Sequence, residues 1–368
     1  MRDVSGGIAV ILPRKEGFSA HRFGAVALTV EDYARHSRYR DMTRVLGTET
    51  SDPRIPELFR AIVPMDRWWR RRNLAFALGC AAYLADAPPR HIDVHNRVEV
   101  FHCLANRFPG AAVSLWLHND PRTMRGAKRT RDRHLLADRA HRIVCVSDWV
   151  RRRFLDGLSL SPDRTIVLPN AMTIPVPRTA GGADEKAPLI LFVGRMSRDK
   201  GGPLFAEAVA RALPVLPGWR AAMIGQGKPG MVRHLASVLG AVADRVSMPG
   251  FLPHEAVMSE FARAAIVVVP SLWDEPFGRT ALEAMASGCA VIATTRGGLP
   301  EVVGDCGVIL DPPETDRLSE AIVALANDGA ARLALQRRAA RRAAEHFAIQ
   351  PWADRLDASR ALIDSAPI

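Results

Sequence analysis

The chain has 368 residues, which exceeds the size of one small module and fits two domains. Hydrophobic residues make up 48% and charged residues 24%, so the chain can bury sizeable cores and most of it is not disordered. Lysine and arginine number 50 against 39 aspartates and glutamates, a formal net charge of +11 that favours an anionic partner: nucleic acid, an anionic membrane surface or a phosphorylated small molecule.

The first half of the chain alternates short apolar runs with helical patterns. We expect strands at 8–12, 42–46, 92–95, 113–118 and 143–147, and helices at 23–37, 68–86, 98–107 and 128–142. The opening run is short and flanked by charge, which is typical of a strand rather than a secretion signal. The longest apolar stretch, 75–85, is well below the ~20 residues of a membrane span.

The second half is more regular. Residues 173–188, rich in proline, glycine and charge, predict a linker. Beyond it we expect strands at 189–194, 219–225, 246–250, 266–270 and 290–294, with helices at 203–213, 253–263 and 280–287. Their continuously apolar strands indicate a parallel sheet covered on both faces, as in a Rossmann-like domain.

The tail predicts a helix at 330–347, a break at Gln350-Pro351 and a final helix at 352–363 that returns to the first domain. We therefore expect an N-terminal domain of residues 1–172 completed by 350–368, a linker at 173–188, and a C-terminal domain of residues 189–349. Five separated cysteines without C-x-x-C spacing predict reduced thiols, hence a cytoplasmic protein.

Two carboxylates, Glu275 and Glu283, lie eight residues apart in EPFGRTALE, after a strand and at the start of a helix. Ligands of parallel sheets bind at this carboxyl edge. The backbone N–H groups of Phe277, Gly278 and Arg279 are expected at the helix N-terminus, where they suit an anion or sugar hydroxyls. A carboxylate accepts paired hydroxyls of a sugar or ribose.

A second loop, GRMSRDKG, places Arg195 and Lys200 after the first strand of the C-terminal domain. Two such cations can clamp a diphosphate. The spacing is neither that of a P-loop nor G-x-G-x-x-G, and no D-x-D metal motif accompanies it, which favours a metal-independent site without a cofactor.

These segments carry a resemblance. EPFGRTALEAMASG, VGRMSRDKGG, GGLPEVV and LPNAM closely resemble the retaining nucleotide-sugar glycosyltransferases of glycosyltransferase family 4, which have the GT-B fold. The resemblance covers nearly all of the C-terminal domain. It is patchier before it, in LPRKEGFSAHRFGAVAL, VHNR, WLHNDP, CVSDWVRRRF and LPNA, where KEGFSAHRFGA departs from the glycine-rich loop of the family. It implies an α/β fold of two Rossmann-like domains whose parallel sheets face each other across a cleft, the N-terminal one for the acceptor and the C-terminal one for the donor.

The resemblance also implies roles for residues. Arg195 and Lys200 would hold the donor diphosphate, Glu283 the ribose, and Glu275 the hydroxyls of the donor sugar. His118 of WLHNDP matches an active-site histidine near the sugar, and Gly24 is a candidate for the family's glycine loop. A double displacement through Glu275 stays an alternative to front-face attack by the acceptor.

The sequence thus predicts a retaining hexosyltransferase that uses a UDP- or GDP-sugar and a glycan or lipid-linked acceptor in bacterial polysaccharide or lipopolysaccharide synthesis. A soluble sugar-phosphate acceptor is the alternative. A nucleic-acid-binding protein is a weaker one, because no nucleic-acid recognition signature is present. The runs RWWRRR at 67–72 and RRR at 151–153 suit either peripheral contact with an anionic inner membrane or a solvated helix face.

Overall fold

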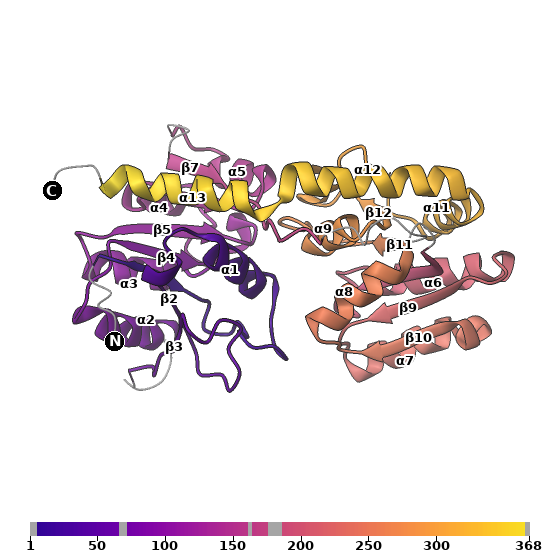
Figure 1. The fold of residues 1–368 in the computed structure, drawn as a ribbon, viewed down its shortest axis with the longest axis horizontal. Coiled ribbons are helices and arrows are strands. Elements are labelled where there is room, and N and C mark those ends of the chain that lie inside the picture. The colour runs from indigo at the N-terminus through magenta and orange to yellow at the C-terminus, as the bar shows by residue number, and fades with distance from the viewer. Residues whose placement is uncertain (1–5, 66–71, 161–163, 176–185, 365–368) are drawn as a thin grey trace. The chain divides into compact units, whose positions relative to one another are not determined.

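The computed structural model describes residues 6–65, 72–160, 164–175 and 186–364 (Figure 1). The chain divides into two compact units. Unit 1 is Met1–Thr173 together with Ala348–Ile368, and unit 2 is Ile174–Phe347.

Unit 1 is built on seven parallel strands in the order β3-β2-β1-β4-β5-β6-β7, counted over the described residues. The strand order reverses between β1 and β4, which makes the carboxyl ends of these strands a crevice for ligands. The strands are β1 (Ile8–Ile11), β2 (Thr43–Gly47), β3 (Phe59–Ala61), β4 (His91–His95), β5 (Ala112–Leu117), β6 (Ile143–Cys145) and β7 (Thr165–Val167). The helices are α1 (Ala25–His36), α2 (Arg72–Ala85), α3 (Val98–Arg107), α4 (Thr130–Arg139) and α5 (Asp148–Leu155).

Unit 2 has six parallel strands in its described part, ordered β10-β9-β8-β11-β12-β13, with the reversal between β8 and β11. The strands are β8 (Ala187–Val193), β9 (Arg220–Ile224), β10 (Val246–Gly250), β11 (Ala264–Val269), β12 (Ala290–Thr294) and β13 (Val308–Leu310). The helices are α6 (Gly202–Ala212), α7 (Pro229–Val238), α8 (His254–Arg263), α9 (Arg279–Ala286), α10 (Leu299–Val303), α11 (Thr315–Asn327) and α12 (Gly329–Phe347). These two sheets confirm the predicted α/β class.

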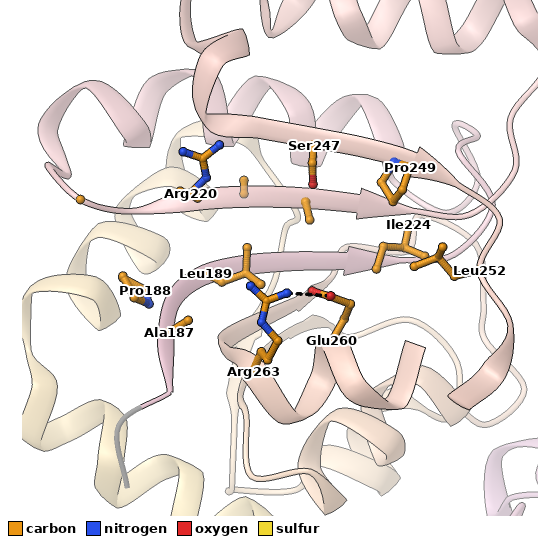
Figure 2. Close-up of a pocket in the computed structure, with 13 residues that line it drawn as sticks. Ala187, Pro188, Leu189, Arg220, Ile224, Ser247, Pro249, Leu252, Glu260 and Arg263 are labelled. Carbon is orange, nitrogen blue, oxygen red and sulfur yellow. Dashed lines mark hydrogen bonds and ion pairs between the residues drawn. The ribbon is translucent and has the colours of Figure 1, made fainter. Parts of the chain in front are cut away.

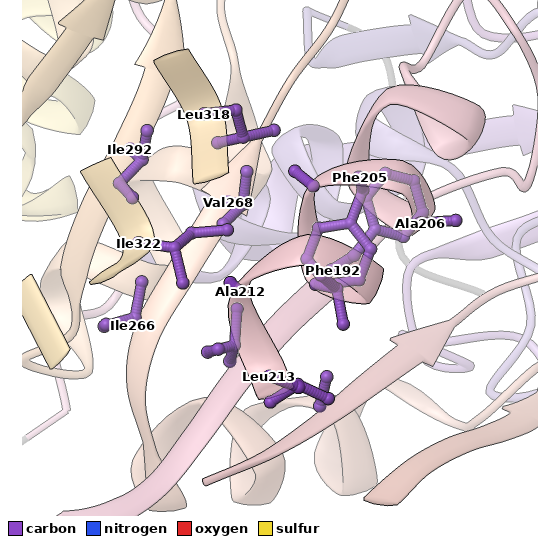
Figure 3. Close-up of a cluster of buried hydrophobic side chains, with 14 of the residues drawn as sticks. Phe192, Phe205, Ala206, Ala212, Leu213, Ile266, Val268, Ile292, Leu318 and Ile322 are labelled. Carbon is purple, nitrogen blue, oxygen red and sulfur yellow. The ribbon is translucent and has the colours of Figure 1, made fainter. Parts of the chain in front are cut away.

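The core of unit 2 explains why its strands lack polar alternation. Every residue of β11 is buried, so both faces of the strand are covered. On one face Ile266 and Val268 pack with Phe192 of β8 and Phe205 of α6, as Figure 3 shows. This packing fixes the strand ends from which the loops of the candidate site emerge.

The expected end of the linker at Pro188 is wrong, because β8 begins at Ala187 and Ala187 pairs with Ala264 of β11. The register shifts between Ala264 and Ile266, opposite Pro188. Proline has no N–H to donate to a ladder, and such an irregularity is where a strand tolerates it.

The last helix, α13 (Ile349–Asp364), returns to unit 1, as predicted. Ile349, Ala353 and Leu356 pack in one buried cluster with Tyr33 and Trp116. The predicted break at Gln350-Pro351 is wrong, since the helix runs through both residues. Proline fits there because the first-turn N–H groups of a helix have no intrahelical partner.

Among the described helices, none combines the length and the apolar character that a membrane crossing requires.

Candidate functional site

Lys200 and Glu275 meet at the carboxyl edge of the unit 2 sheet. Lys200 Nζ lies 2.6 Å from Glu275 Oε1, and the two side chains are only 23% and 11% exposed. The Ser271 hydroxyl donates to the same carboxylate oxygen at 2.5 Å. Lys200 Nζ also lies 4.8 Å from the centre of the Trp273 ring. The structure therefore joins two loops that the sequence analysis treated as separate signals.

Backbone packing holds these loops in place. Gly201 and Gly297 have φ of +73° and +65°, and a Cβ on either would lie 1.9 Å from Pro270 O or 2.1 Å from Glu275 O. The Gly298 N–H donates to that same Glu275 carbonyl at 2.6 Å. Only glycine fits at both positions, so the GRMSRDKG and GGLPEVV motifs support the geometry of the Lys200–Glu275 pair.

Glu283, on α9, is buried between two nitrogen donors. Its Oε1 lies 2.9 Å from Arg279 Nε and 3.1 Å from His254 Nε2. Burial pushes the pKa of Glu283 up, but the hydrogen bond to His254 and the Arg279 charge outweigh it and lower the pKa below its usual value. The group is therefore a carboxylate at neutral pH.

The N-terminus of α9 starts one residue earlier than predicted. Gly278 is the N-cap, with φ +106°, and Arg279 is the first helical residue. The amides without an intrahelical partner are consequently those of residues 278–281. Phe277 precedes this set, and its side chain is buried against Phe347 with the rings edge to face.

Arg195 is placed differently from Lys200, although both lie in the same loop. Its guanidinium is 66% exposed and pairs with Asp199, Nη2 to Oδ2, at 2.8 Å. Partial burial raises the pKa of Asp199, yet the Ser197 hydroxyl and the Arg195 charge bring it below its usual value. Arg195 can thus bind an anion from solvent either while it stays paired with Asp199 or after this ion pair breaks.

His118 belongs to unit 1, directly after β5. Its Nε2 lies 2.8 Å from His95 Nδ1, and its backbone N–H donates to Asn96 Oδ1 at 2.9 Å. Burial, with a smaller contribution from His95, holds the pKa of His118 well below the usual histidine value. The imidazole is therefore neutral at neutral pH.

Gly24 is the N-cap of α1, where a carboxylate of the chain already lies. Glu16 Oε1 accepts the Ala27 N–H at 3.2 Å, and a Cβ on Gly24 would come within 2.6 Å of the same oxygen. Burial raises the pKa of Glu16, while the Ala27 amide, the Arg97 charge and the Gly24 amide oppose the rise. An anion at this helix end would compete with Glu16.

A cavity of about 320 Å³ lies along β8, β9 and β10, away from these residues (Figure 2). Its wall includes the Arg263–Glu260 ion pair, at 2.8 Å, and Arg220. None of the predicted site residues lines it. Within the described part of the chain, no three histidine, cysteine or acidic side chains converge as metal ligands.

Sequence reasoning missed four side chains that hold predicted site residues. Ser271 ends the IVVVPS run and could have been suspected from its place at the strand end. His254 and His95 carry no local signal, because they lie 29 and 23 residues from Glu283 and His118, and Glu16 lies 11 residues before Ala27, whose N–H it accepts beside Gly24.

Residues 176–345 match the family model described as Glycosyl transferases group 1. The D-inositol 3-phosphate glycosyltransferase of Geodermatophilus obscurus is 32% identical over 71% of this chain and 60% of its own length. The phosphatidylinositol N-acetylglucosaminyltransferase gpi3 subunit of Schizosaccharomyces pombe is 29% identical over 50% and 41%. The chain thus spans between about two fifths and three fifths of these relatives.

Solved structures match over almost the whole chain. Anabaena Alr3699/HepE in complex with UDP and glucose has a TM-score of 0.76 at 17% identity, covering 97% of this chain and 100% of that one. WaaG, a glycosyltransferase involved in lipopolysaccharide biosynthesis, has a TM-score of 0.70 at 18% identity, covering 98% and 100%. These likenesses show the fold, which is GT-B.

Proposed function

This chain belongs to glycosyl transferases group 1, and from that premise we propose that it is a retaining glycosyltransferase using a nucleoside-diphosphate hexose. The observation that carries the proposal is the contact between Lys200 and Glu275 at one edge of the sheet. Glu275 lies eight residues before the buried carboxylate Glu283. One edge thus offers a cation for phosphate and two carboxylates for hydroxyls, the chemistry of a nucleotide sugar.

Lys200 is proposed to bind the donor diphosphate while it stays bonded to Glu275. An ammonium has three N–H donors, and its contacts with Glu275 leave capacity for phosphate oxygens. Arg195, released from Asp199, and the amides at the N-terminus of α9 would add positive potential. Glu283, held by Arg279 and His254, would accept ribose hydroxyls.

Charge development defines what these groups do in the reaction. Breaking the anomeric C–O bond leaves negative charge on the nucleoside diphosphate, and Lys200 and Arg195 would stabilise it more as the bond lengthens. The acceptor hydroxyl would attack from the same face and give its proton to a phosphate oxygen, with His118 beside the sugar. Since Glu275 Oε1 already accepts from Lys200 and Ser271, its geometry supports a hydroxyl acceptor rather than the nucleophile of a double displacement.

We propose that transfer needs neither cofactor nor metal, since Lys200 and Arg195 supply the positive charge. Transfer should then persist in EDTA, as measured by product formation at constant ionic strength. A loss of turnover that magnesium or manganese restores would contradict this.

The acceptor is proposed to be a hydroxyl of a glycan or lipid-linked sugar in bacterial polysaccharide or lipopolysaccharide synthesis. A soluble sugar phosphate is the second candidate. It is favoured by the relative named D-inositol 3-phosphate glycosyltransferase, at 32% identity.

Peripheral contact with an anionic membrane face would accompany a lipid-linked acceptor. Most of the 67–72 run lies outside the described residues. Of the 151–153 run, on α5, Arg151 and Arg152 pair with Asp148, and Arg153 pairs with Asp120. These partners favour a solvated helix face over a lipid contact for α5.

Transfer of labelled hexose tests the function. UDP- and GDP-hexoses are offered with a bacterial lipid extract or with soluble inositol and hexose phosphates, and products are identified by mass. Lys200→Ala and Glu275→Gln should each lower kcat/KM by about a hundredfold or more, because both groups act where charge develops. Lys128→Ala, at an exposed position of unit 1, should leave the rate unchanged.

Absence of transfer from every donor, with no rise in Tm on adding UDP, GDP or ADP, would overturn the proposal, since a ligand of the native state raises Tm by mass action. Full turnover of Lys200→Ala or Glu275→Gln would overturn the site assignment alone.

A further inference from the structure

Two arginines follow the strands on either side of the reversal in the unit 1 sheet. Ile11 and Val94 pair near the ends of β1 and β4, and Arg14 and Arg97 each lie three residues beyond this pair. Both side chains therefore start from the carboxyl edge of the sheet at the same register. Ligands of open parallel sheets bind at such a reversal.

Hydrogen bonds hold the backbone at both arginines. The Thr48 hydroxyl, just after β2, donates to the Arg14 carbonyl at 3.2 Å. Directly before Arg97, Asn96 has a left-handed φ of +58°, and its Oδ1 accepts the His118 N–H at 2.9 Å. The two loops that carry the guanidiniums are thus tied to the neighbouring strand ends.

Neither guanidinium is neutralised by an ion pair. In the part of the chain that the structure describes, no ion pair includes Arg14 or Arg97. Arg14 Nε is buried and has no hydrogen-bond partner among those residues. Arg97 is half-buried, and its Nη1 donates only to the adjacent Asn96 carbonyl, at 2.9 Å. Because removing a cation from water without an anion costs free energy, this arrangement favours the binding of an anion.

Glu16 is the carboxylate that acts on this pair of arginines, and it is already engaged. Its Oε1 accepts the Ala27 N–H at 3.2 Å, at the start of α1. The electrostatics agree with the geometry: burial lowers the pKa of Arg97 most, the Glu16 charge opposes this effect, and the Arg14 charge adds to it. Two cations beside one carboxylate leave one positive charge uncompensated.

We propose that Arg14 and Arg97 bind a phosphate group of the acceptor at the carboxyl edge of the unit 1 sheet. That the bound molecule is the acceptor rests on the proposed function. A planar guanidinium matches two phosphate oxygens with paired N–H groups, and two guanidiniums suit a group that carries more than one negative charge. The phosphate belongs either to a soluble sugar phosphate or to the diphosphate of a lipid-linked sugar.

Binding in the absence of any donor tests the site in the full chain. Glucose 6-phosphate and a polyprenyl diphosphate in detergent are titrated by calorimetry at constant ionic strength, beside glucose and the polyprenyl alcohol. One phosphorylated probe should bind at least about tenfold tighter than its unphosphorylated counterpart, and the tighter probe identifies the source of the phosphate. Equal affinities within both pairs overturn the proposal.

Substitutions separate a built site from a diffuse positive surface. Arg14→Ala and Arg97→Ala should each weaken binding of the phosphorylated probe about tenfold or more, and Arg14→Lys should recover only part of it. Lys15→Ala is the matched control, since it removes one charge from an exposed position of the same loop. An equal loss in Lys15→Ala overturns the proposal, as does a loss of UDP or GDP affinity in place of the acceptor probe. Thermal unfolding checks that the variants fold.

Glu16→Gln tests the charge balance from the opposite side. The amide oxygen can still accept the Ala27 N–H, while the negative charge beside Arg97 is removed. The phosphorylated probe should therefore bind about threefold tighter. An unchanged or lower affinity contradicts the placement of the phosphate beside Arg97.

Kinetics links the site to the proposed function. In Arg14→Ala the KM for the acceptor should rise about tenfold, with kcat and the KM for the donor little changed, because the lost contact is the same in the ground state and the transition state. Phosphorylated probes that bind as expected, with no transfer in the wild type, would overturn the proposed function and leave the phosphate site. Transfer by Arg14→Ala with the wild-type KM would overturn the site and leave the function.

Discussion

At the scale of single residues, the two carboxylates of unit 2 are held alike. Each presents one oxygen to two donors from different elements: Glu275 to Lys200 and Ser271, and Glu283 to Arg279 and His254. Two donors fix both the rotamer and the plane of a carboxylate. The directions of the remaining lone pairs are therefore set before a ligand binds, which lowers the cost of ordering the site.

Glu283 should make the free energy of unfolding decrease as the pH becomes acidic. Its folded pKa is lowered, so its stabilisation is complete above the unfolded pKa and is lost as pH falls through the folded pKa. Glu283→Gln should destabilise the chain by about 3 kcal/mol at pH 7, because Arg279 stays buried without its carboxylate. Urea unfolding at pH 7 and at steps below pH 5 measures both effects.

In Glu283→Gln the loss of stability toward acid should be smaller than in the wild type. Glu320→Gln, on the exposed side of α11, should match the wild type at every pH. Parallel curves for Glu283→Gln and the wild type would contradict the prediction.

Gly297→Ala should lower stability and transfer by more than the strain of a positive φ alone would. The new Cβ would lie 2.1 Å from the Glu275 carbonyl, so the Glu275 loop must shift. Gly218→Ala is the matched control, since it has φ of +82° but open space at the Cβ. We expect a cost of about 1–2 kcal/mol for the control and more for Gly297→Ala, with transfer impaired only in the latter.

At the scale of elements, a buried ion cluster ties α13 to unit 1. Arg360 bonds Asp93 of β4 at 2.5 Å and Asp357 at 3.3 Å. Asp357 accepts the Ser37 hydroxyl and the Arg38 N–H, each at 2.7 Å, just after α1. All three charged residues are under 9% exposed, so each depends on the others for solvation.

Arg360→Ala should destabilise the chain by about 3–5 kcal/mol, because Asp93 and Asp357 would remain buried without a cation. Chemical denaturation followed by circular dichroism measures the change. Arg355→Ala, on the exposed side of α13 with its guanidinium 5.4 Å from the centre of the Trp352 ring, is the control and should cost under about 1 kcal/mol. Equal costs for the two variants would contradict the assigned role of the cluster.

Sequence periodicity predicts some elements to the residue and misses others. Residues 98–107 and 290–294 match α3 and β12 to the residue. The strands β3, β7 and β13 and the helices α5 and α11 were not among the predicted elements; each of these strands has only three residues, and half of the residues of α5 are charged. Motifs likewise indicate Lys200 and Glu275, whereas His95 and His254 become partners of site residues only through strand order and helix packing.

At the scale of the whole molecule, several arginines bind groups of the chain itself, although these contacts leave the net charge at +11. Arg338 of α12 pairs with Asp305 at 3.0 Å, and Arg342 donates to the carbonyls of Glu301 and Val302 at 2.8 Å. The arginine-rich helix α12 therefore closes the C-terminal end of α10 as well as facing solvent. Excess charge in the composition is a weak guide to a partner when arginines bind the chain itself.

The double variant Arg151→Ala/Arg152→Ala should bind anionic phospholipid vesicles much as the wild type does, because both side chains are ion-paired with Asp148 on α5. Vesicle flotation at low and high salt measures binding. A markedly weaker association of the double variant at low salt would place a lipid contact on α5 instead.

The chain crosses between the units twice, and the unit 1 ends of both crossings are adjacent. The Ile349 N–H donates to the Met172 carbonyl at 3.0 Å, beside a parallel bridge between Met172 and Ala348. Unit 2 thus has the topology of a domain inserted into unit 1 between Met172 and Ile349. A short peptide between Met172 and Ile349 would therefore close unit 1 without unit 2. At this same junction, unit 2 of a relative could replace unit 2 of this chain, so that the proposed donor and acceptor preferences could be recombined independently.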